Sequence, residues 1–303
     1  MISTAEIKDF FKGKLTLNEP MAPYTTFRIG GVADYFIEPS DADDLLNMIK
    51  YLRSIEMPYY VMGNGSNVLI SDQGIRGVVI NLESGFGYLR NENGFIIAGA
   101  GAKIARFVEF CIQNRCAGVE MLAGIPATIG GTLVMNAGAY GGEISTYVKE
   151  VTVIRGDKLK TLAGEECGFI YRNSNLKGSI ILEAKFELPE GDPVEIGAKR
   201  RELMIHRNET QPVEIPNAGC IFKNPKGYFA AKLIDECGLK GKSVGGAMVS
   251  SKHANFIVNF DNATAGDVIE LINIVKKTVK QKTGIDLELE VKLVGFEEEL
   301  LHD

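Results

Sequence analysis

The sequence predicts an α+β protein that contains several separate sheets. In the first third of the chain, short apolar runs typical of strands alternate with helical periodicity. Residues 118–142 are rich in glycine and almost uncharged, and residues 285–295 alternate apolar with polar side chains as a half-buried strand does. The 303 residues are enough for two or three domains with a sizeable core.

The composition, with 45% apolar and 24% charged residues, is that of an ordinary globular protein. A net charge of −6 without any basic run argues against nucleic acid as a partner. The apolar runs are too short to span a bilayer. The N-terminus reads as a helix with Ser3 and Glu6 as its capping box, and not as a signal peptide, so we expect a cytoplasmic protein. The five cysteines are odd in number and contain no CxxC pair, which argues against zinc sites and disulfide frameworks.

In the first half, Ser40 is predicted to cap a helix over residues 41–56, whose apolar stripe is formed by Leu45, Ile49, Leu52 and Ile55. A second helix is predicted over residues 103–115, with Cys111 on its core face. The predicted strands are residues 32–39, 58–63, 77–82 and 95–102, a hairpin that turns at Gly156-Asp157, and the stretch that begins at Gly178.

Residues 118–142 are predicted to be too irregular for a helix and too apolar for a linker. A glycine-rich loop that is not polar is typical of a segment that wraps a large, partly apolar ligand.

A boundary between two halves is predicted at Pro189–Pro193. The second half is predicted to contain a basic helix at residues 195–209, a helix at 228–238, a strand at 254–260 and a long helix at 264–284. In the final strand, 285–295, the odd-numbered apolar residues face one way and the charged residues face the other.

The motif "GNGSN" (63–67) follows a strand, so its backbone N–H groups are suited to bind a pyrophosphate. It is neither a Rossmann fingerprint nor a P-loop, and a tight turn is the competing interpretation. Arg172 is either a clamp for a carboxylate or phosphate or an ordinary surface residue. Glu290 is either a site carboxylate or part of a solvated strand face.

Cys220 lies in "PNAGCIFKNP", directly after Ala218-Gly219. A thiol in this position is a nucleophile, a metal ligand, a proton donor or an inert small hydrophobe. A Cys220–His253 pair is a conceivable nucleophile and base, but no oxyanion-hole motif accompanies it. No metal-binding motif is present.

Several motifs occur here in a specific order: "YTTFRIGG", "MGNGSNVLISD", "AGIPATIGGTLVMNAGAYGGE", "YRNS", "GCIFKNP", "AAKLIDECGLKGKSVGGAMVS" and "LELEVKLVG". Together they resemble the UDP-N-acetylenolpyruvoylglucosamine reductases of bacterial peptidoglycan precursor synthesis, over residues 20 to 295. The compact length is similar to the family's second type, which lacks a segment of the substrate domain.

The resemblance implies a two-lobed FAD-binding fold of the vanillyl-alcohol-oxidase type, with lobes at residues 1–75 and 76–192, and an α+β substrate-binding domain at 193–303. The last strand of that domain is expected to return to the FAD region. FAD is expected to be bound non-covalently, since no histidine lies in residues 1–205. The implied cofactor-binding residues are Tyr24, Thr26, Gly63, Asn64, Gly65, Ser66, Asn67, Val68, Gly124, Ile125, Pro126, Thr128, Gly130, Gly131, Asn136, Gly138, Ala139 and Gly141.

The resemblance also implies two half-reactions, in which NADPH reduces FAD and the hydride then passes to the enolpyruvyl group of a UDP-sugar. Arg172 and Glu290 match residues that act at the substrate carboxylate. The position of Cys220 is serine, the proton donor, in better-known members. A thiol is suited to the same task, because its ordinary pKa of about 8.5 leaves it mostly protonated at neutral pH. The implied substrate-binding residues are Arg207, Gln211, Lys223, Asn224 and His253.

We expect a monomer in which the UDP-sugar and NADPH use one pocket in turn, because no Rossmann domain is evident. Three other functions compete with this interpretation: another oxidoreductase on the same FAD fold, a non-catalytic nucleotide-sugar-binding protein, and a cysteine-dependent transferase. Yellow protein that releases FAD on denaturation distinguishes the flavoenzymes from the other two.

Overall fold

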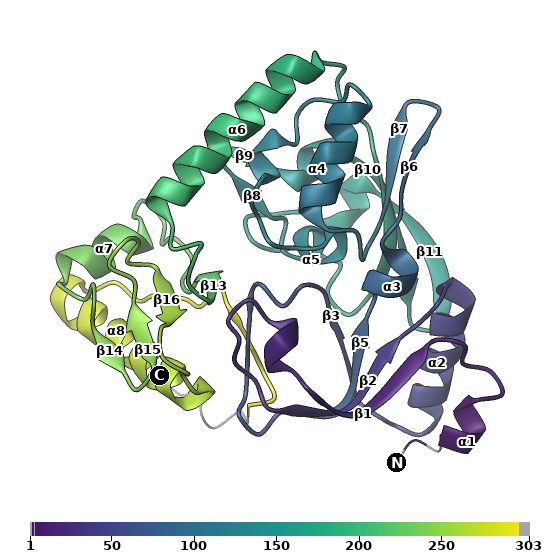
Figure 1. The fold of residues 1–303 in the computed structure, drawn as a ribbon, viewed down its shortest axis with the longest axis horizontal. Helices are drawn as coiled ribbons and strands as arrows, with labels where there is room; N and C mark the ends of the chain where they lie inside the picture. Colours follow the sequence, from purple (N-terminus) through teal and green to yellow (C-terminus); the bar gives the residue numbers. More distant parts are fainter. Residues whose placement is uncertain (1, 3, 297–303) are drawn as a thin grey trace. The chain divides into compact units, whose positions relative to one another are not determined.

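The structure is a computed structural model that describes residue 2 and residues 4–296. The chain divides into two compact units. The first contains residues 1–17, 35–64 and 77–205, and the second contains residues 18–34, 65–76 and 206–303. Each unit has a hydrophobic core of its own. The division falls inside strands β1, β2 and β5 and inside helix α6 (Figure 1).

The N-terminal part of the chain builds two sheets, of which one has the strand order β1-β2-β5-β3 and the other β11-β10-β12-β7-β6. Their strands are β1 (Lys14–Pro20), β2 (Val32–Glu38), β3 (Tyr59–Met62), β5 (Ile75–Asn81), β6 (Leu89–Glu92), β7 (Phe95–Gly99), β10 (Val148–Arg155), β11 (Lys158–Ala163) and β12 (Ile180–Phe186). A small hairpin joins β8 (Gly138–Ala139) to β9 (Gly142–Glu143). The helices are α1 (Thr4–Ile7), α2 (Ala42–Ser54), α3 (Glu83–Phe86), α4 (Ile104–Gln113), α5 (Ile129–Val134) and α6 (Pro193–Thr210).

The core of the first unit is built from the apolar faces of α2 and α4 and the inner faces of the strands. Leu45, Ile49 and Leu52 of α2 are fully buried, as the helical periodicity predicted. Phe107 of α4 packs against Phe186 of β12 with its ring tilted, and the ring centroids are 4.9 Å apart. Burial of a side chain of this size stabilises the fold by about 1.5–3 kcal/mol.

Two details of α2 differ from the sequence prediction. The cap is Asp41, whose side chain accepts a hydrogen bond from the backbone of Asp44, and not Ser40. Ser40 instead donates its backbone N–H and its hydroxyl to the carboxylate of Asp44. Ile55 lies just beyond the helix and is 38% exposed, so it does not extend the apolar stripe. Ser3, the predicted cap of the first helix, lies outside the described residues.

The prediction that residues 118–142 contain no helix is wrong. Residues 129–134 form α5, whose first turn is capped by the Thr128 hydroxyl. Two glycines in six residues conceal this helix in the sequence, because glycine is a poor helix former. Tertiary packing offsets that cost, since Ile129 and Leu133 are fully buried.

The second unit has a sheet with the strand order β13-β16-β15-β14. Its elements are β4 (Val68–Ile70), β13 (Asn217–Cys220), α7 (Ala230–Glu236), β14 (Ser243–Val244), β15 (Ala247–Val249), β16 (Phe256–Asn259), α8 (Ala265–Thr283) and β17 (Lys292–Val294). The apolar face of α8 is buried through Val268, Leu271, Ile272, Val275 and Val279.

Two contacts tie the distant chain segments of this unit together. The carboxylate of Asp72, just after β4, accepts hydrogen bonds from the first backbone N–H groups of α8, at Ala265 and Gly266. β17 pairs with β4 in parallel, with Lys292 opposite Val68. The predicted last strand is shorter than expected, since only residues 292–294 are regular strand, although Leu287 and Val291 are buried as their alternation predicted.

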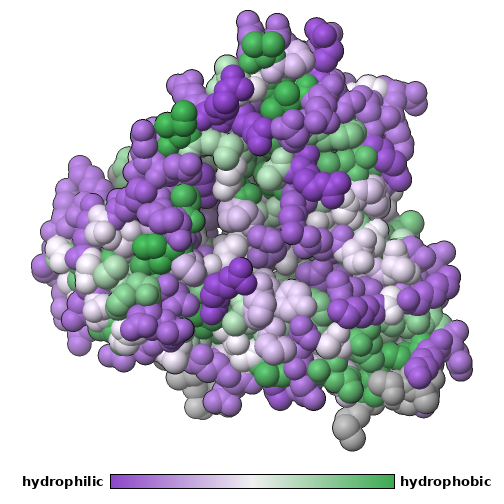
Figure 2. Space-filling model, in the orientation of Figure 1, coloured by the Kyte–Doolittle hydropathy of each residue, from purple (hydrophilic) through white to green (hydrophobic). Residues whose placement is uncertain are grey.

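The surface is mixed in character. On the face drawn in Figure 2, hydrophobic residues are scattered among hydrophilic ones, as is usual for globular proteins. Among the described residues, no helix combines the length and the apolar character that a membrane span requires.

Candidate active site

In the first unit, the loop that follows β3 is fixed to the glycine-rich stretch. The side-chain amide of Asn64 donates a hydrogen bond to the carbonyl of Pro126, at 2.7 Å. Gly63 lies so close to Thr128 that an added Cβ would be 2.3 Å from the threonine hydroxyl oxygen. Residue 63 therefore has to be glycine for the loop to reach the start of α5.

The segment around Thr128 is held by backbone hydrogen bonds. Ile129 donates to Ala102 at 2.9 Å, and Gly130 donates to Ala100 at 2.8 Å. Gly131 donates its backbone N–H to the hydroxyl of Thr128. Before it, Gly124 and Pro126 are exposed and Ile125 is half-buried. The backbone of this segment is therefore held in place by hydrogen bonds. The segment carries several of the residues that the resemblance assigns to FAD binding, from Gly124 to Gly131.

Arg172 lies on a tight turn. Ile170 and Asn173 exchange backbone hydrogen bonds at 3.0 and 3.1 Å, so that Tyr171 and Arg172 form the tip. Arg172 has a φ of +54°, which costs a residue other than glycine about 1–2 kcal/mol. Its Nη2 donates to the carbonyl of Gly138 at 3.0 Å, and its guanidinium lies 5.1 Å from the centre of the Tyr171 ring. Backbone strain of this kind is concentrated at functional sites.

The glycine-rich hairpin provides the acceptor for Arg172. Gly138 and Ala139 pair with Glu143 and Gly142, and the tip is formed by Tyr140 and Gly141, with φ of +53° and +81°. The hydroxyl of Tyr140 donates to the carbonyl of Leu203 in α6 at 3.1 Å. Asn136, just before the hairpin, is 1% exposed and also has a positive φ, of +41°.

In the second unit, the other half of the "GNGSN" loop contacts residues 24–26. Gly65, with a φ of +59°, accepts a hydrogen bond from the backbone N–H of Thr26 at 3.2 Å. A Cβ at position 65 would be 2.3 Å from the carbonyl oxygen of Tyr24. The hydroxyl of Thr26 donates to the carbonyl of Asn217 at 2.7 Å, and the hydroxyl of Tyr24 donates to Glu19.

Cys220 and Glu290 are neighbours through the backbone. Glu290 donates its N–H to the carbonyl of Ile221, the residue after Cys220, at 2.8 Å. The side-chain amide of Asn67 donates to the carbonyl of Glu290 at 3.2 Å. The glycine loop, the cysteine strand and the final segment of the chain therefore meet at one place within the second unit.

The strand that carries Cys220 is held by its backbone on two sides. Cys220 is paired with Phe256 of β16, and Ile221 donates its N–H to the carbonyl of Asn255 at 2.8 Å. Gly219 has a φ of +75°, which only glycine adopts easily. A Cβ added to Gly219 would lie 3.9 Å from the carbonyl oxygen of Ser66. The half-buried thiol at position 220 is thus fixed beside the loop.

The predicted substrate residues Lys223 and Asn224 already have partners within the unit. Lys223 forms an ion pair with Glu288. The side-chain oxygen of Asn224 accepts a hydrogen bond from the backbone of Ala230, at the start of α7, at 3.0 Å. Asn224 therefore has a structural contact that sequence reasoning did not foresee.

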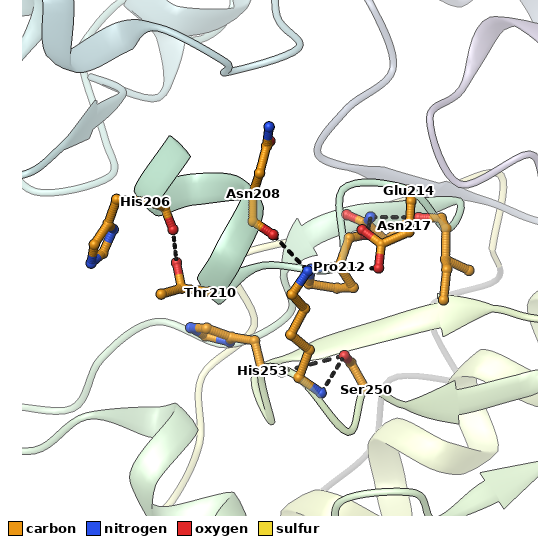
Figure 3. A network of polar contacts seen from close by, with 10 residues as sticks. His206, Asn208, Thr210, Pro212, Glu214, Asn217, Ser250 and His253 are labelled. Carbon is orange, nitrogen blue, oxygen red and sulfur yellow. Dashed lines mark hydrogen bonds and ion pairs between the residues drawn. The ribbon is translucent and has the colours of Figure 1, made fainter. Parts of the chain in front are cut away.

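Figure 3 shows the surroundings of His253 and the end of α6. The imidazole Nδ1 of His253 accepts a hydrogen bond from the backbone N–H of Asn255, and burial lowers the pKa of this histidine because it disfavours the charged form. Lys252 donates to the carbonyl of Asn208 at 2.6 Å. At the C-terminal end of α6, Gln211 donates its backbone N–H to Arg207. The carboxamide oxygen of Gln211 is buried and accepts no hydrogen bond from the described residues.

The other cysteines differ from Cys220. Cys111, Cys116, Cys167 and Cys237 are buried, whereas Cys220 is half-buried. Burial raises the pKa of the Cys167 thiol to about 11 and also raises the pKa values of Cys111 and Cys116. These three thiols are suited to the core and not to chemistry. Within the described part of the chain, no group of His, Cys, Asp or Glu side chains is arranged to hold a metal ion.

Sequence analysis did not single out two asparagines whose side chains have buried polar atoms. Asn255 is 3% exposed, and its carboxamide both accepts from the N–H and donates to the carbonyl of Phe222. The carboxamide oxygen of Asn173, next to Arg172, is buried and accepts no hydrogen bond within the described residues. Asparagine is common in turns, so the sequence carries no signal that separates these two from ordinary turn residues.

The loop around Gly65 fits a bound diphosphate. In the part of the chain that the structure describes, the backbone N–H groups of Gly65 and Ser66 donate no hydrogen bond. Consecutive N–H groups of this kind, with one residue at positive φ, form an anion-binding concavity. This loop is therefore suited to hold the diphosphate of a dinucleotide.

Comparisons with known proteins agree with this geometry. Residues 33–158 match the family model described as FAD binding domain, and residues 211–294 match the C-terminal domain of UDP-N-acetylenolpyruvoylglucosamine reductase. The chain is therefore a FAD-binding oxidoreductase. The two matches confirm the predicted α+β fold class, a FAD-binding domain of the vanillyl-alcohol-oxidase type with a further α+β domain.

Whole-chain relatives identify the family. The UDP-N-acetylenolpyruvoylglucosamine reductase of Caldanaerobacter subterraneus is 46% identical over 96% of this chain and 97% of its own length. The enzyme of the same name from Chloroherpeton thalassium is 42% identical over 98% of this chain and 99% of its own length. The crystal structure of the Thermus caldophilus enzyme has a TM-score of 0.81 at 36% identity and covers 94% of this chain and 100% of its own. The chain belongs to the UDP-N-acetylenolpyruvoylglucosamine reductase family, which acts in peptidoglycan precursor synthesis.

Proposed function

We propose that the protein reduces the enolpyruvyl ether of UDP-N-acetylglucosamine to UDP-N-acetylmuramate, with NADPH as the reductant. FAD, held by the loop around Gly65, would supply the redox chemistry, which carries a hydride from NADPH to the methylene carbon of the enolpyruvyl group. A proton completes the reduction at the adjacent carbon, so that one hydride and one proton add across the double bond. The observation that carries the proposal is the meeting of Cys220, Glu290 and the glycine loop within one unit.

Each proposed role follows from the chemistry of the side chain. The N–H groups of Gly65 and Ser66 bind the FAD diphosphate. Cys220 donates the proton through its thiol. Arg172 holds the substrate carboxylate while negative charge develops on it as an enolate, because a planar guanidinium matches a carboxylate in two hydrogen bonds. Glu290 assists at the same carboxylate.

The remaining proposals concern the substrates. Arg207 and Gln211 contact the diphosphate or sugar of the substrate, and the buried carboxamide oxygen of Gln211 supports this because a substrate N–H or O–H would satisfy it. Lys223 and His253 are further contacts in the same region. NADPH and the UDP-sugar use one pocket in turn, and the protein acts as a monomer. The three-domain division at residues 75 and 192 stays a prediction.

Anaerobic half-reactions test the proposal. Purified protein is expected to be yellow and to release FAD on denaturation. NADPH alone should bleach the flavin, excess UDP-sugar should slow this bleaching, and UDP-sugar added to reduced protein should restore the colour and form UDP-N-acetylmuramate. Colourless protein that takes up no flavin would refute the proposal, and independent, additive binding of the two substrates would refute the shared pocket.

A further inference from the structure

Asn136 makes three hydrogen bonds to the protein through its side chain, although the resemblance assigns it to the cofactor. The residue is 1% exposed. Its Nδ2 donates to the carboxylate of Glu143 at 2.8 Å and to the carbonyl of Ile170 at 3.2 Å. Its Oδ1 accepts from the backbone N–H of Ser145 at 3.4 Å. Both N–H groups of the amide are thereby used, which leaves no donor for a cofactor.

The two acceptors of this amide belong to the two segments that determine where Arg172 lies. Ile170 is the first residue of the turn whose tip is Tyr171-Arg172. Glu143 is the last residue of the hairpin and is paired with Gly138, whose carbonyl accepts from Arg172. One carboxamide therefore joins the turn that carries the guanidinium to the hairpin that receives it.

The geometry of the turn makes such a tether necessary. Arg172 has a φ of +54°, a conformation that persists only where the surroundings enforce it. Asn136 also has a positive φ, of +41°, which is an unusual backbone conformation for a residue with a side chain. Asparagine is among the residues that tolerate this conformation, and it supplies two donors at short reach.

We propose that Asn136 is a positioning residue for Arg172 and not a contact of FAD. Its amide holds the 170–173 turn against the 138–143 hairpin, so that the guanidinium is preorganised before substrate arrives. The inference rests on the proposed function, because it assumes that Arg172 acts on the substrate. It predicts that loss of the amide slows the step that uses Arg172 and leaves the other half-reaction intact.

The experiment compares two variants of position 136 in the full-length holoenzyme. Asn136→Asp removes both donors at constant size, and Asn136→Gly removes the side chain while tolerating the positive φ. With either variant, reoxidation of reduced flavin by the UDP-sugar should slow about 10- to 100-fold, since a small misplacement of a catalytic group costs this much. Bleaching by NADPH and the Kd for FAD should stay within about twofold of wild type, because neither step uses Arg172.

Two further variants make the result specific. Asn114→Asp is the matched control. Asn114 is the C-cap of α4, and its side-chain amide donates a hydrogen bond to the carbonyl of Phe110 at 2.8 Å. It belongs neither to the 170–173 turn nor to the 138–143 hairpin. This variant should leave both half-reactions unchanged. Arg172→Lys should slow reoxidation, and adding Asn136→Gly to it should slow reoxidation no further, because a positioning residue acts only through its target.

The outcomes separate the inference from the function on which it rests. If Arg172→Lys slows reoxidation but neither variant of Asn136 does, the inference is wrong and the role of Arg172 stands. If the effects of the two positions add, or if the Asn136 variants lose FAD, Asn136 acts independently of Arg172 and the inference is again wrong. If Arg172→Lys leaves reoxidation unchanged, the proposed role of Arg172 fails and the inference fails with it.

Discussion

The turn that carries Arg172 and the strand that carries Cys220 are held in different ways. The turn depends on side chains, since the amide of Asn136 and the guanidinium itself connect it to the neighbouring hairpin. The strand depends on the backbone, since β16 pairs with Cys220 on one side and Glu290 bonds to Ile221 on the other. A backbone ladder is insensitive to the side chain at position 220, whereas a tethered turn responds to one substitution. The two regions should therefore differ in which mutations they tolerate.

The largest effect is expected for Cys220→Ala. This change removes the proposed proton donor while the backbone hydrogen bonds of the strand remain. Reoxidation of reduced flavin by the UDP-sugar should fall by about 10²–10⁴, the usual contribution of a placed acid. FAD content and bleaching by NADPH, both followed by absorbance, should be unchanged. Reoxidation at the wild-type rate would show that the proton comes from another group.

A smaller loss is expected for Arg172→Lys. Lysine keeps the charge but loses the planar fork, so the two hydrogen bonds to a carboxylate cannot form together. Because a hydrogen bond to a charged group contributes about 1.5–3 kcal/mol, reoxidation should slow about 10- to 100-fold. Stopped-flow absorbance separates this step from reduction by NADPH, which should survive. Two unchanged half-reactions would mean that Arg172 is structural.

Cys220→Ser should retain activity within about tenfold of wild type, because a hydroxyl is also a proton donor. The same change should remove sensitivity to iodoacetamide at pH 8. The Cys167 thiol has its pKa raised to about 11, and burial raises the pKa of Cys111 further. Only about one Cys167 thiol in a thousand is ionised at pH 8, so it reacts slowly. Inactivation of the serine variant at the wild-type rate would place the sensitive thiol elsewhere.

The smallest effect is expected for Asn224→Ala, which tests a residue assigned to the substrate by resemblance. Its side-chain oxygen accepts from the backbone of Ala230 at the start of α7, and loss of one such hydrogen bond costs about 1 kcal/mol. Thermal unfolding should shift by a few degrees while the KM for the UDP-sugar stays the same. A raised KM with an unchanged melting temperature would make Asn224 a substrate contact.

Sequence reasoning predicted the elements whose periodicity is strong, and it failed where tertiary contacts decide. The buried stripe of α2 follows from the spacing of Leu45, Ile49 and Leu52. The cap at Asp41 could not be told from Ser40, because both residue types cap helices. Helix α5 was missed because its two glycines disfavour a helix, and the burial of Ile129 and Leu133 that offsets this cost is not visible in the sequence. For the site, motifs marked Arg172 and Cys220, but the tether from Asn136 depends on a side-chain direction that no motif encodes.

The second unit is assembled from three stretches of chain, residues 18–34, 65–76 and 206–303. The bond from Asn67 to Glu290 joins residues 223 positions apart. During synthesis on the ribosome, residues 18–34 and 65–76 emerge early and are able to contact each other, as Thr26 does with Gly65. Their contacts with Asn217 and Glu290 form only after the last third of the chain has left the exit tunnel. The glycine loop therefore completes late, and the nascent chain exposes it for as long as translation of the remaining residues takes. Cofactor capture by this fold is for that reason expected to be a post-translational event.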